Sequence, residues 1–247
     1  MGELTEIIKL DATDSTNLYL KDLLLSQELL DYTTVVTKNQ RKGRGQLGTI
    51  WETEEGKNLT FSVLKNLGSC KVSEQFKLNI CVSLAVYDAL NQYEVPNIKI
   101  KWPNDIMSGS FKICGILIEN LLKGQFIKNV IIGIGLNVNQ TQFGTLTKAS
   151  SLSGVMGRQF DLNELLASLR SNLKLRLDAI NQKTFQQLQT EYEQLLFRKD
   201  KPSTFKNQQE ELFMGIIRGI SEEGKLIVEL EDDSVQKYDL KEVTLQY

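Results

Sequence analysis

The sequence predicts an α+β fold, with a mixed, largely antiparallel sheet, helices on one side of that sheet and a small β unit at the C-terminal end. Three observations lead to this class. Two β-type runs are joined by a glycine-rich loop and two others form a hairpin, so neighbouring strands are mainly antiparallel. Apolar residues recur at helical spacing in separate segments. Short strands gather again near the C-terminus, as is typical of folds in which helices and strands are segregated.

The first elements are a strand and a helix. Residues 3–10 alternate weakly between apolar and polar side chains, which predicts a strand. Residues 14–17 supply helix-capping side chains before a leucine-rich run, so a helix is expected to start near Ser15. Two further strands are expected at 33–38 and 59–65, on either side of the glycine-rich loop.

The middle of the chain predicts a long helix and a hairpin. Residues 72–93 place apolar side chains on one helical face. Residues 98–102 form a short strand that is stopped by Pro103. The apolar runs 112–121 and 126–139 are separated by a short glycine-containing turn and predict two paired strands.

The C-terminal part predicts two helices and then a change of structure. Asp161 caps a helix that reaches residue 177, and a second helix covers 184–197. The composition becomes charged at residues 198–202, so we expect a domain of residues 1–198 followed by a small β-barrel of residues 199–247. Three short strands are expected there: 211–220, 225–230 and 235–240.

Composition narrows the possible functions. The 247 residues carry a formal net charge of −2, which disfavours a broad nucleic-acid-binding face. There is no apolar run long enough to span a membrane and no signal peptide, so a cytoplasmic protein without membrane attachment is expected. The three cysteines lack metal-ligand spacing. Histidine is absent, which excludes Ser-His-Asp and Cys-His catalysis, histidine metal sites and the usual kinase catalytic loop.

The glycine-rich loop points to an anionic substrate. Gly43, Gly45 and Gly48 fit the pattern G-x-G-x-x-G, which indicates dinucleotide binding only when a helix follows. Here a second strand follows, so that interpretation fails. The loop also carries three cations: Arg41, Lys42 and Arg44. A permissive, basic loop between two strands can fold over a phosphate-bearing substrate and become ordered with it.

Three further segments carry polar or small residues at strand ends. Residues 101–106 end a strand with Pro-Asn-Asp, residues 112–119 begin a strand with a lysine, and residues 133–139 interrupt a strand with two glycines. Each has an ordinary structural explanation, such as a surface turn, a lysine at a sheet edge or room for a packed helix. Together with the basic loop they provide what is needed to bind a nucleoside triphosphate and a carboxylate and to join them.

At this point the chain resembles the biotin protein ligases. Four motifs match in order: Gly43-Arg44-Gly45 with Trp51, the run 101–106, the run Lys112-x-x-Gly-Ile-Leu-x-Glu, and the run 133–139. Residues 14–17 match as well. The resemblance implies the class II synthetase-like fold of biotin and lipoate ligases, with an SH3-like barrel at the C-terminal end. It also implies the monofunctional type without an N-terminal DNA-binding domain, so no specific DNA binding is expected.

The same resemblance implies roles for the matched residues. Those expected to bind biotin are Ser15, Thr16, Asn17, Gln40, Arg44, Gly45, Gln46, Lys112 and Gly115. Those expected to bind ATP or the adenylate are Gly43, Arg44, Trp51, Asn104, Asp105, Lys112 and Asn137. Those expected to act in catalysis are Lys112, Arg44 and Asp105, with Asp105 also a candidate magnesium ligand. Many members have an arginine where Gln46 stands in this chain.

The implied reaction has two steps. Biotin and MgATP give biotinyl-5'-AMP and pyrophosphate, and the biotinyl group then passes to a lysine of the biotin carboxyl carrier protein. A homodimer is possible. Two alternatives remain open: a lipoate or octanoate ligase or transferase of the same superfamily, and a non-catalytic module that binds biotin or a nucleotide. An octanoyltransferase would need a catalytic cysteine, and Cys114, near Lys112, is more typical of a core residue.

Overall fold

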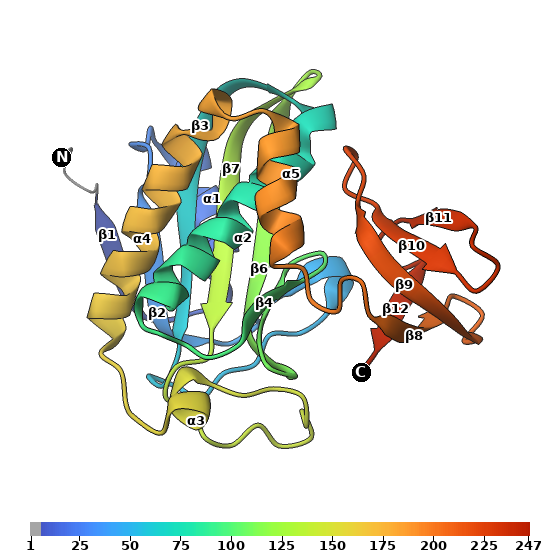
Figure 1. Cartoon of the computed structure of the whole chain (residues 1–247). Helices are drawn as coiled ribbons and strands as arrows, with labels where there is room; N and C mark the ends of the chain where they lie inside the picture. Colours follow the sequence, from blue (N-terminus) through green and yellow to red (C-terminus); the bar gives the residue numbers. More distant parts are fainter. Residues whose placement is uncertain (1–5) are drawn as a thin grey trace.

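The computed structural model describes residues 6–247 and contains two sheets (Figure 1). The larger sheet has seven strands in the order β1-β2-β3-β7-β6-β5-β4. Only β1 and β2 are parallel, and the other neighbours are antiparallel, which confirms the predicted mixed sheet. The strands are β1 (Ile7–Thr13), β2 (Thr34–Gln40), β3 (Leu59–Lys71), β4 (Ile98–Lys101), β5 (Asp105–Ser108), β6 (Phe111–Lys123) and β7 (Phe126–Leu136).

Helices cover both faces of this sheet, although the sequence predicted them on one side. The helices α2 (Gln75–Gln92), α4 (Leu162–Asp178) and α5 (Phe185–Gln194) pack together over one face. A short helix α3 (Leu152–Met156) lies between β7 and α4 in the chain. Helix α1 (Thr16–Ser26) departs from this arrangement and packs on β2, β3 and β7 from the opposite side. The reason is a second, smaller apolar cluster on that face, formed by Leu20, Val35, Leu64 and Ile131.

The C-terminal strands form a separate antiparallel sheet in the order β11-β10-β9-β8-β12. They are β8 (Pro202–Asn207), β9 (Leu212–Ile220), β10 (Leu226–Leu230), β11 (Val235–Tyr238) and β12 (Val243–Gln246). The sequence did not indicate β8 or β12, because a proline begins the first and charged residues precede the second. The indole Nε1 of Trp102 donates to the carbonyl of Gly224 at 2.9 Å, which joins this sheet to the larger one. The domain boundary after residue 198 stays a prediction.

Other elements differ from the expectation for identifiable reasons. The chain turns back after β4 and continues as β5, so Asp105 begins a strand that the sequence did not predict. The predicted helix 184–197 ends at Gln194, because the backbone of residues 195–197 bonds to Ile100 of β4 instead. Asp161 caps α4 as predicted, accepting from two backbone amides. The part of the first predicted strand at residues 3–5 lies outside the described residues. Among the described residues, no helix is long and apolar enough to cross a bilayer.

The buried side chain of Lys65 in β3 joins the large sheet to Asp178 in α4. Lys65 Nζ lies 2.6 Å from Asp31 Oδ2 and 3.2 Å from Asp178 Oδ1, and its side chain is only 10% exposed. The hydroxyl of Tyr32 donates to the same Asp178 oxygen at 2.5 Å. Burial by itself would raise the pKa of Asp178, but hydrogen bonds from Lys174, Tyr32 and Lys65 lower that pKa to about 2.

This cluster predicts acid sensitivity. Because the pKa of Asp178 is lower in the folded state than in the unfolded chain, its contribution to stability is present above pH 4 and is lost as the pH falls toward 2. Asp178→Asn should lower the free energy of unfolding at pH 7 by about 1 kcal/mol, a value reduced for the partial exposure of the group. Urea unfolding at pH 7 and at pH 3 measures this, and the difference from wild type should shrink at the lower pH. The exposed Asp22→Asn is the control; an equal loss in both variants would contradict the expectation.

Candidate functional site

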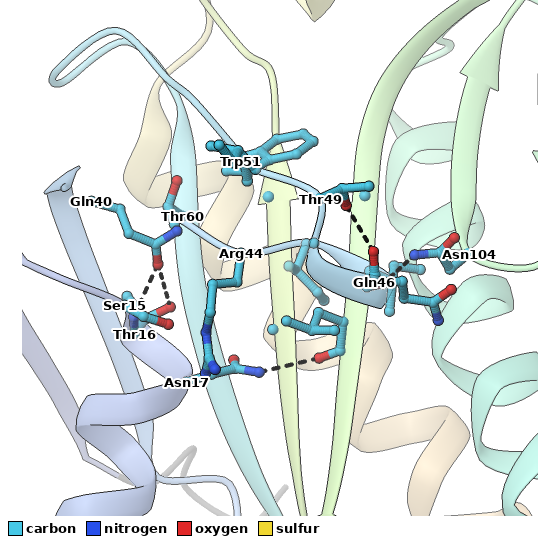
Figure 2. A pocket seen from close by; sticks show the side chains of 18 of the residues that line it. Ser15, Thr16, Asn17, Gln40, Arg44, Gln46, Thr49, Trp51, Thr60 and Asn104 are labelled. Carbon is cyan, nitrogen blue, oxygen red and sulfur yellow. Dashed lines mark hydrogen bonds between the residues drawn. The ribbon is translucent and has the colours of Figure 1, made fainter. Parts of the chain in front are cut away.

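A cavity of about 260 Å³ lies on the face of the large sheet that α1 covers, next to the first turn of that helix (Figure 2). It collects residues from the start of α1, from the glycine-rich loop and from five strands, β2, β3, β5, β6 and β7. Of the predicted site residues, all but Gly43 and Asn137 line it: Ser15, Thr16, Asn17, Gln40, Arg44, Gly45, Gln46, Trp51, Asn104, Asp105, Lys112 and Gly115.

The floor of the cavity is made by small residues in register across the sheet. Under α1, Leu64 pairs with Ile131 and gives an apolar row. Two residues further along β7, Gly133 pairs with Ser62 of β3 on one side and Leu117 of β6 on the other. Two residues further again, Gly135 lies between Thr60 and Gly115, and Gly115 pairs in turn with Asp105 of β5. Alternate residues of a strand share a face, so these rows belong to the same surface. The surface changes from apolar to small and polar where α1 begins, and this change creates the cavity.

Uncharged polar groups meet at the inner end of the cavity. Gln40 Oε1 accepts from the backbone amide of Thr16 at 2.9 Å. Ser62 Oγ lies 2.7 Å from Thr16 Oγ1 and 2.5 Å from Asn17 Oδ1. A Cβ atom on Gly133 would lie 2.4 Å from Asn17 Oδ1, so the glycine is what lets this amide reach the sheet. Ser15 precedes the helix as predicted, but its side chain makes no capping bond.

The glycine-rich loop covers the other side of the cavity. Its ends are held by an Arg44–Ile50 bridge, and the backbone amide of Trp51 donates to the carbonyl of Gly43 at 3.0 Å. Gly43 therefore packs against the backbone of Trp51 and does not line the cavity. A Cβ atom on Gly43 would lie 2.0 Å from the carbonyl oxygen of Trp51. The indole of Trp51 lies on the glycine floor, with Cε2 only 2.3 Å from the position of a Cβ on Gly135. Its Nε1 has no hydrogen-bond partner within residues 6–247.

Charged groups meet at the outer end. Lys112 Nζ lies 2.6 Å from Asp105 Oδ1, and Lys101 Nζ lies 3.8 Å from the other oxygen of that carboxylate. Burial, opposed by Asp105 but reinforced by the charges of Lys112 and Lys148, lowers the pKa of Lys101. Asp105 thus faces two ammonium groups, of which only that of Lys112 lines the cavity. The amide of Asn104 donates to the Ile116 carbonyl at 2.7 Å, which fixes its orientation beside them.

Asn137 lies in a second cavity of about 370 Å³, which shares Ile50, Trp51 and Lys112 with the first. Its amide donates to the carbonyl of Ser150 at 3.0 Å and so holds the loop that follows β7. The two cavities together therefore contain every predicted site residue except Gly43.

The sequence did not single out Ser62 or Glu119 as site residues. Glu119 Oε2 accepts from Asn17 Nδ2 at 2.7 Å, and Oε1 lies 3.5 Å from an Arg44 guanidinium nitrogen. Both residues could have been found from strand alternation. Ser62 interrupts an apolar strand, and Glu119 lies on the same face as Gly115 two pleats away.

Comparisons with known proteins agree with the sequence motifs. Residues 10–137 match the model of the biotin/lipoate A/B protein ligase family. The chain is 27% identical over 230 residues to the bifunctional ligase/repressor BirA of Escherichia coli, covering 92% of this chain and 70% of that protein. It is 33% identical over 161 residues to a biotin–[acetyl-CoA-carboxylase] ligase of Paracoccus denitrificans, covering 62% and 65%. The solved biotin protein ligase of Aquifex aeolicus in complex with biotin and ATP superposes with a TM-score of 0.80 at 27% identity, over 98% of both chains.

The glycine floor makes a prediction about packing. Gly133→Ala should lower the free energy of unfolding by about 2 kcal/mol, because the new methyl group overlaps a buried amide held by two partners. Gly115→Ala should cost less than about 1 kcal/mol, because its Cβ would lie 3.1 Å from Trp51 Cζ3 and at an ordinary contact distance of 3.5 Å from Lys112 Nζ. Urea unfolding measures the loss in the free energy of unfolding for each variant. Equal losses in Gly133→Ala and Gly115→Ala would show that Asn17 is not fixed in place.

Proposed function

The chain belongs to the biotin/lipoate A/B protein ligase family, as its motifs predicted, and on this premise we propose that it is an ATP-dependent biotin protein ligase. It activates biotin to biotinyl-5'-AMP, releases pyrophosphate, and transfers the biotinyl group to a lysine of a carrier protein. One observation carries this proposal: a single cavity joins an end lined by hydroxyl and amide side chains, next to the Arg44–Glu119 ion pair, to a cationic end at Lys112. The names of the Aquifex aeolicus complex and of the Paracoccus denitrificans relative support the choice of biotin and ATP.

Biotin fits the cavity with its ring system inward. Its ureido group is neutral and both donates and accepts hydrogen bonds, as do the amides and hydroxyls of Thr16, Asn17 and Gln40. The glycines let Asn17 and Trp51 approach the sheet backbone, and these two side chains are among those that line the cavity in which the bicyclic ring would lie. The carboxylate at the end of the side chain then lies toward Lys112, while the Arg44 side chain extends from the loop toward Asn17 (Figure 2).

Activation requires the approach of two anions. An oxygen of the biotin carboxylate attacks the α-phosphorus of ATP, a C–O–P linkage forms, and the bond to the leaving pyrophosphate breaks. The carboxylate is already ionised, so no general base is needed. Lys112 and Arg44 reduce the repulsion and stabilise the charge on the α-phosphate. Asp105 and Glu119 hold these two cations in position before the anions bind.

Magnesium is proposed as the partner of ATP. Among the described residues, no group of three or more Asp, Glu, Cys or His side chains could enclose a metal ion. Mg²⁺ commonly takes one or two carboxylates together with substrate phosphates. Asp105 is the residue that would hold it, and its chemistry would be to neutralise the polyphosphate.

The second step transfers biotin to an amine. The lysine nitrogen of the carrier attacks the carbonyl carbon of the mixed anhydride, an amide bond forms, and AMP leaves with the electrons of the broken C–O bond. The nitrogen must lose a proton, and Asp105 is the candidate acceptor within the cavity. The loop over the cavity excludes water, which would otherwise hydrolyse the anhydride. The carrier protein is the proposed partner, while the cytoplasmic location and the homodimer remain predictions from the sequence.

The alternative octanoyltransferase mechanism is disfavoured. Cys114 is fully buried in the large apolar core, on the face of the sheet opposite the cavity. Burial raises the pKa of its thiol, so a nucleophilic thiolate is disfavoured. A non-catalytic binding module is also a weaker explanation, because the cavity brings together both Arg44 and Lys112.

The activation step can be tested by mass spectrometry of reactions with MgATP. Biotin should give biotinyl-5'-AMP, and pyrophosphate release should depend on biotin. Lys112→Gln should slow adenylate formation by at least about 100-fold, since it removes the cation between the two anions. Lys128→Gln, which removes an exposed charge at the far end of β7, should match wild type. Adenylate from lipoate or octanoate but none from biotin would keep the fold and refute the named substrate.

Cys114 provides a second test. Cys114→Ala should lower stability by about 1–2 kcal/mol through a small buried cavity, yet it should leave kcat for adenylate formation within about twofold of wild type. Loss of activity in a folded Cys114→Ala protein, as judged by circular dichroism, would restore the cysteine-dependent transferase as the better explanation.

A further inference from the structure

A chain of hydrogen bonds at the inner end of the cavity ends on a carboxylate. Asn17 Nδ2 donates to Glu119 Oε2 at 2.7 Å, and Asn17 Oδ1 lies 2.5 Å from Ser62 Oγ. Ser62 Oγ in turn lies 2.7 Å from Thr16 Oγ1. Asn17, Ser62 and Thr16 are each at most 3% exposed. Groups this deeply buried take their hydrogen bonds from one another, so the direction of one bond constrains the next.

The carboxylate fixes the direction of the first bond. An ionised carboxylate only accepts hydrogen bonds, so the part of the Asn17 amide that faces Glu119 is the NH2 group. The same nitrogen also faces the Leu117 carbonyl at 3.4 Å. Asn17 therefore presents its oxygen to Ser62. Arg44 lies 3.5 Å from the other Glu119 oxygen and balances its charge, and Figure 2 shows the Arg44 side chain extending toward Asn17.

The single proton of each hydroxyl fixes the remaining bonds. Ser62 Oγ lies within reach of two oxygens, but it has one proton, and Asn17 Oδ1 has none. Ser62 therefore donates to Asn17, and Thr16 donates to Ser62. The Thr16 hydroxyl then has no proton for Gln40 Oε1 at 3.3 Å, which already accepts from the Thr16 backbone amide at 2.9 Å. Thr16 lines the cavity, and its hydroxyl oxygen is left there as an acceptor.

We propose that Glu119, through this hydrogen-bond chain, commits the Thr16 hydroxyl to accept a hydrogen bond from an N–H group of the ligand. The inference rests on the proposed function, because it takes biotin as the ligand and the ureido ring as the donor. Glu119 is not among the residues that line the cavity, so it is a positioning residue. Gln40 lines the same end, and its NH2 group is a donor for the ureido oxygen.

A committed acceptor discriminates between head groups. Biotin has ureido N–H groups, whereas the dithiolane ring of lipoate and the alkyl chain of octanoate have none. Either of these acids would cover the Thr16 hydroxyl oxygen without giving it a partner. A site built to hydrogen-bond its substrate rejects an analogue without the matching group much more strongly than an apolar pocket does. Glu119 thus contributes to the choice of biotin over other carboxylic acids.

Biotin binding to the full chain, measured by isothermal titration calorimetry without ATP, tests the start of the chain. Glu119→Leu removes the acceptor for Asn17 and should raise the Kd for biotin by at least about tenfold. Glu119→Gln keeps an oxygen that accepts from Asn17 and should stay within about threefold of wild type. Glu28→Leu, which removes an exposed glutamate outside the cavity, is the control. Equal losses in Glu119→Leu and Glu119→Gln would overturn the orienting role.

Ser62→Ala tests the middle of the chain and does not depend on the folding of Glu119→Leu, which circular dichroism checks. It frees the Thr16 proton for Gln40 and should raise the Kd for biotin by about tenfold, while the KM for ATP stays within about twofold of wild type. The double variant Glu119→Leu with Ser62→Ala should bind little more weakly than the weaker single variant, because both changes break one chain. Multiplicative effects, or an equal rise in the KM for ATP, would indicate a merely structural role and overturn the inference.

The outcomes distinguish this role from the proposed reaction. A biotin Kd that is unchanged in both Glu119→Leu and Ser62→Ala would overturn the positioning role even if wild type forms biotinyl-5'-AMP. Conversely, a wild-type protein that makes no adenylate but shows the expected pattern of biotin affinities would support the role of Glu119 and refute the proposed activation. A wild-type protein without affinity for biotin would overturn both.

Discussion

The site depends on one packing constraint, which is the loss of side-chain bulk along a single face of the large sheet. Under α1 this face is apolar, with Leu64 and Ile131 closing against the helix. Where the helix begins, Gly133, Gly135 and Gly115 remove the side chains from the next two rows. Backbone is then accessible to Asn17 on one side and to Trp51 on the other. A side chain at Gly133 or Gly135 would overlap Asn17 or Trp51 and so displace a side chain that lines the cavity.

The second organising feature is the pairing of Lys112 and Arg44, two cations that line the cavity, with carboxylates. Lys112 is held by Asp105, and Arg44 is held by Glu119 across the cavity. Neither pair is fully buried, so each is weak enough for an anionic substrate to compete with it. These ion pairs keep two long side chains aimed at the cavity, which reduces the conformational entropy lost when the anions bind.

The C-terminal sheet is physically part of this arrangement. Trp102 follows Lys101 directly, and its indole is bonded to a turn of that sheet. On the other side of the junction, a Glu193 carboxylate oxygen of α5 accepts from the backbone amide of Ile220 at 3.0 Å. The position of Lys101 is therefore set from both sheets at once. A small β unit that cannot bury much surface by itself gains order through these contacts.

The sequence alone determined the family, the fold class and most of the residues that line the cavity. It could do so because each motif is a short run at the end of a strand, where local glycine, proline and capping chemistry defines the backbone, as at Asp161. Tertiary structure decided which face α1 covers, that Asp105 begins a strand, and that Asn137 lies in the adjacent cavity. It also decided the pairs Arg44–Glu119 and Lys148–Tyr247. These contacts join segments far apart in the chain, and they follow from strand order and register. Strand order and register are set when β3 pairs with β7 and when the two sheets pack together. No local sequence pattern specifies these long-range pairings.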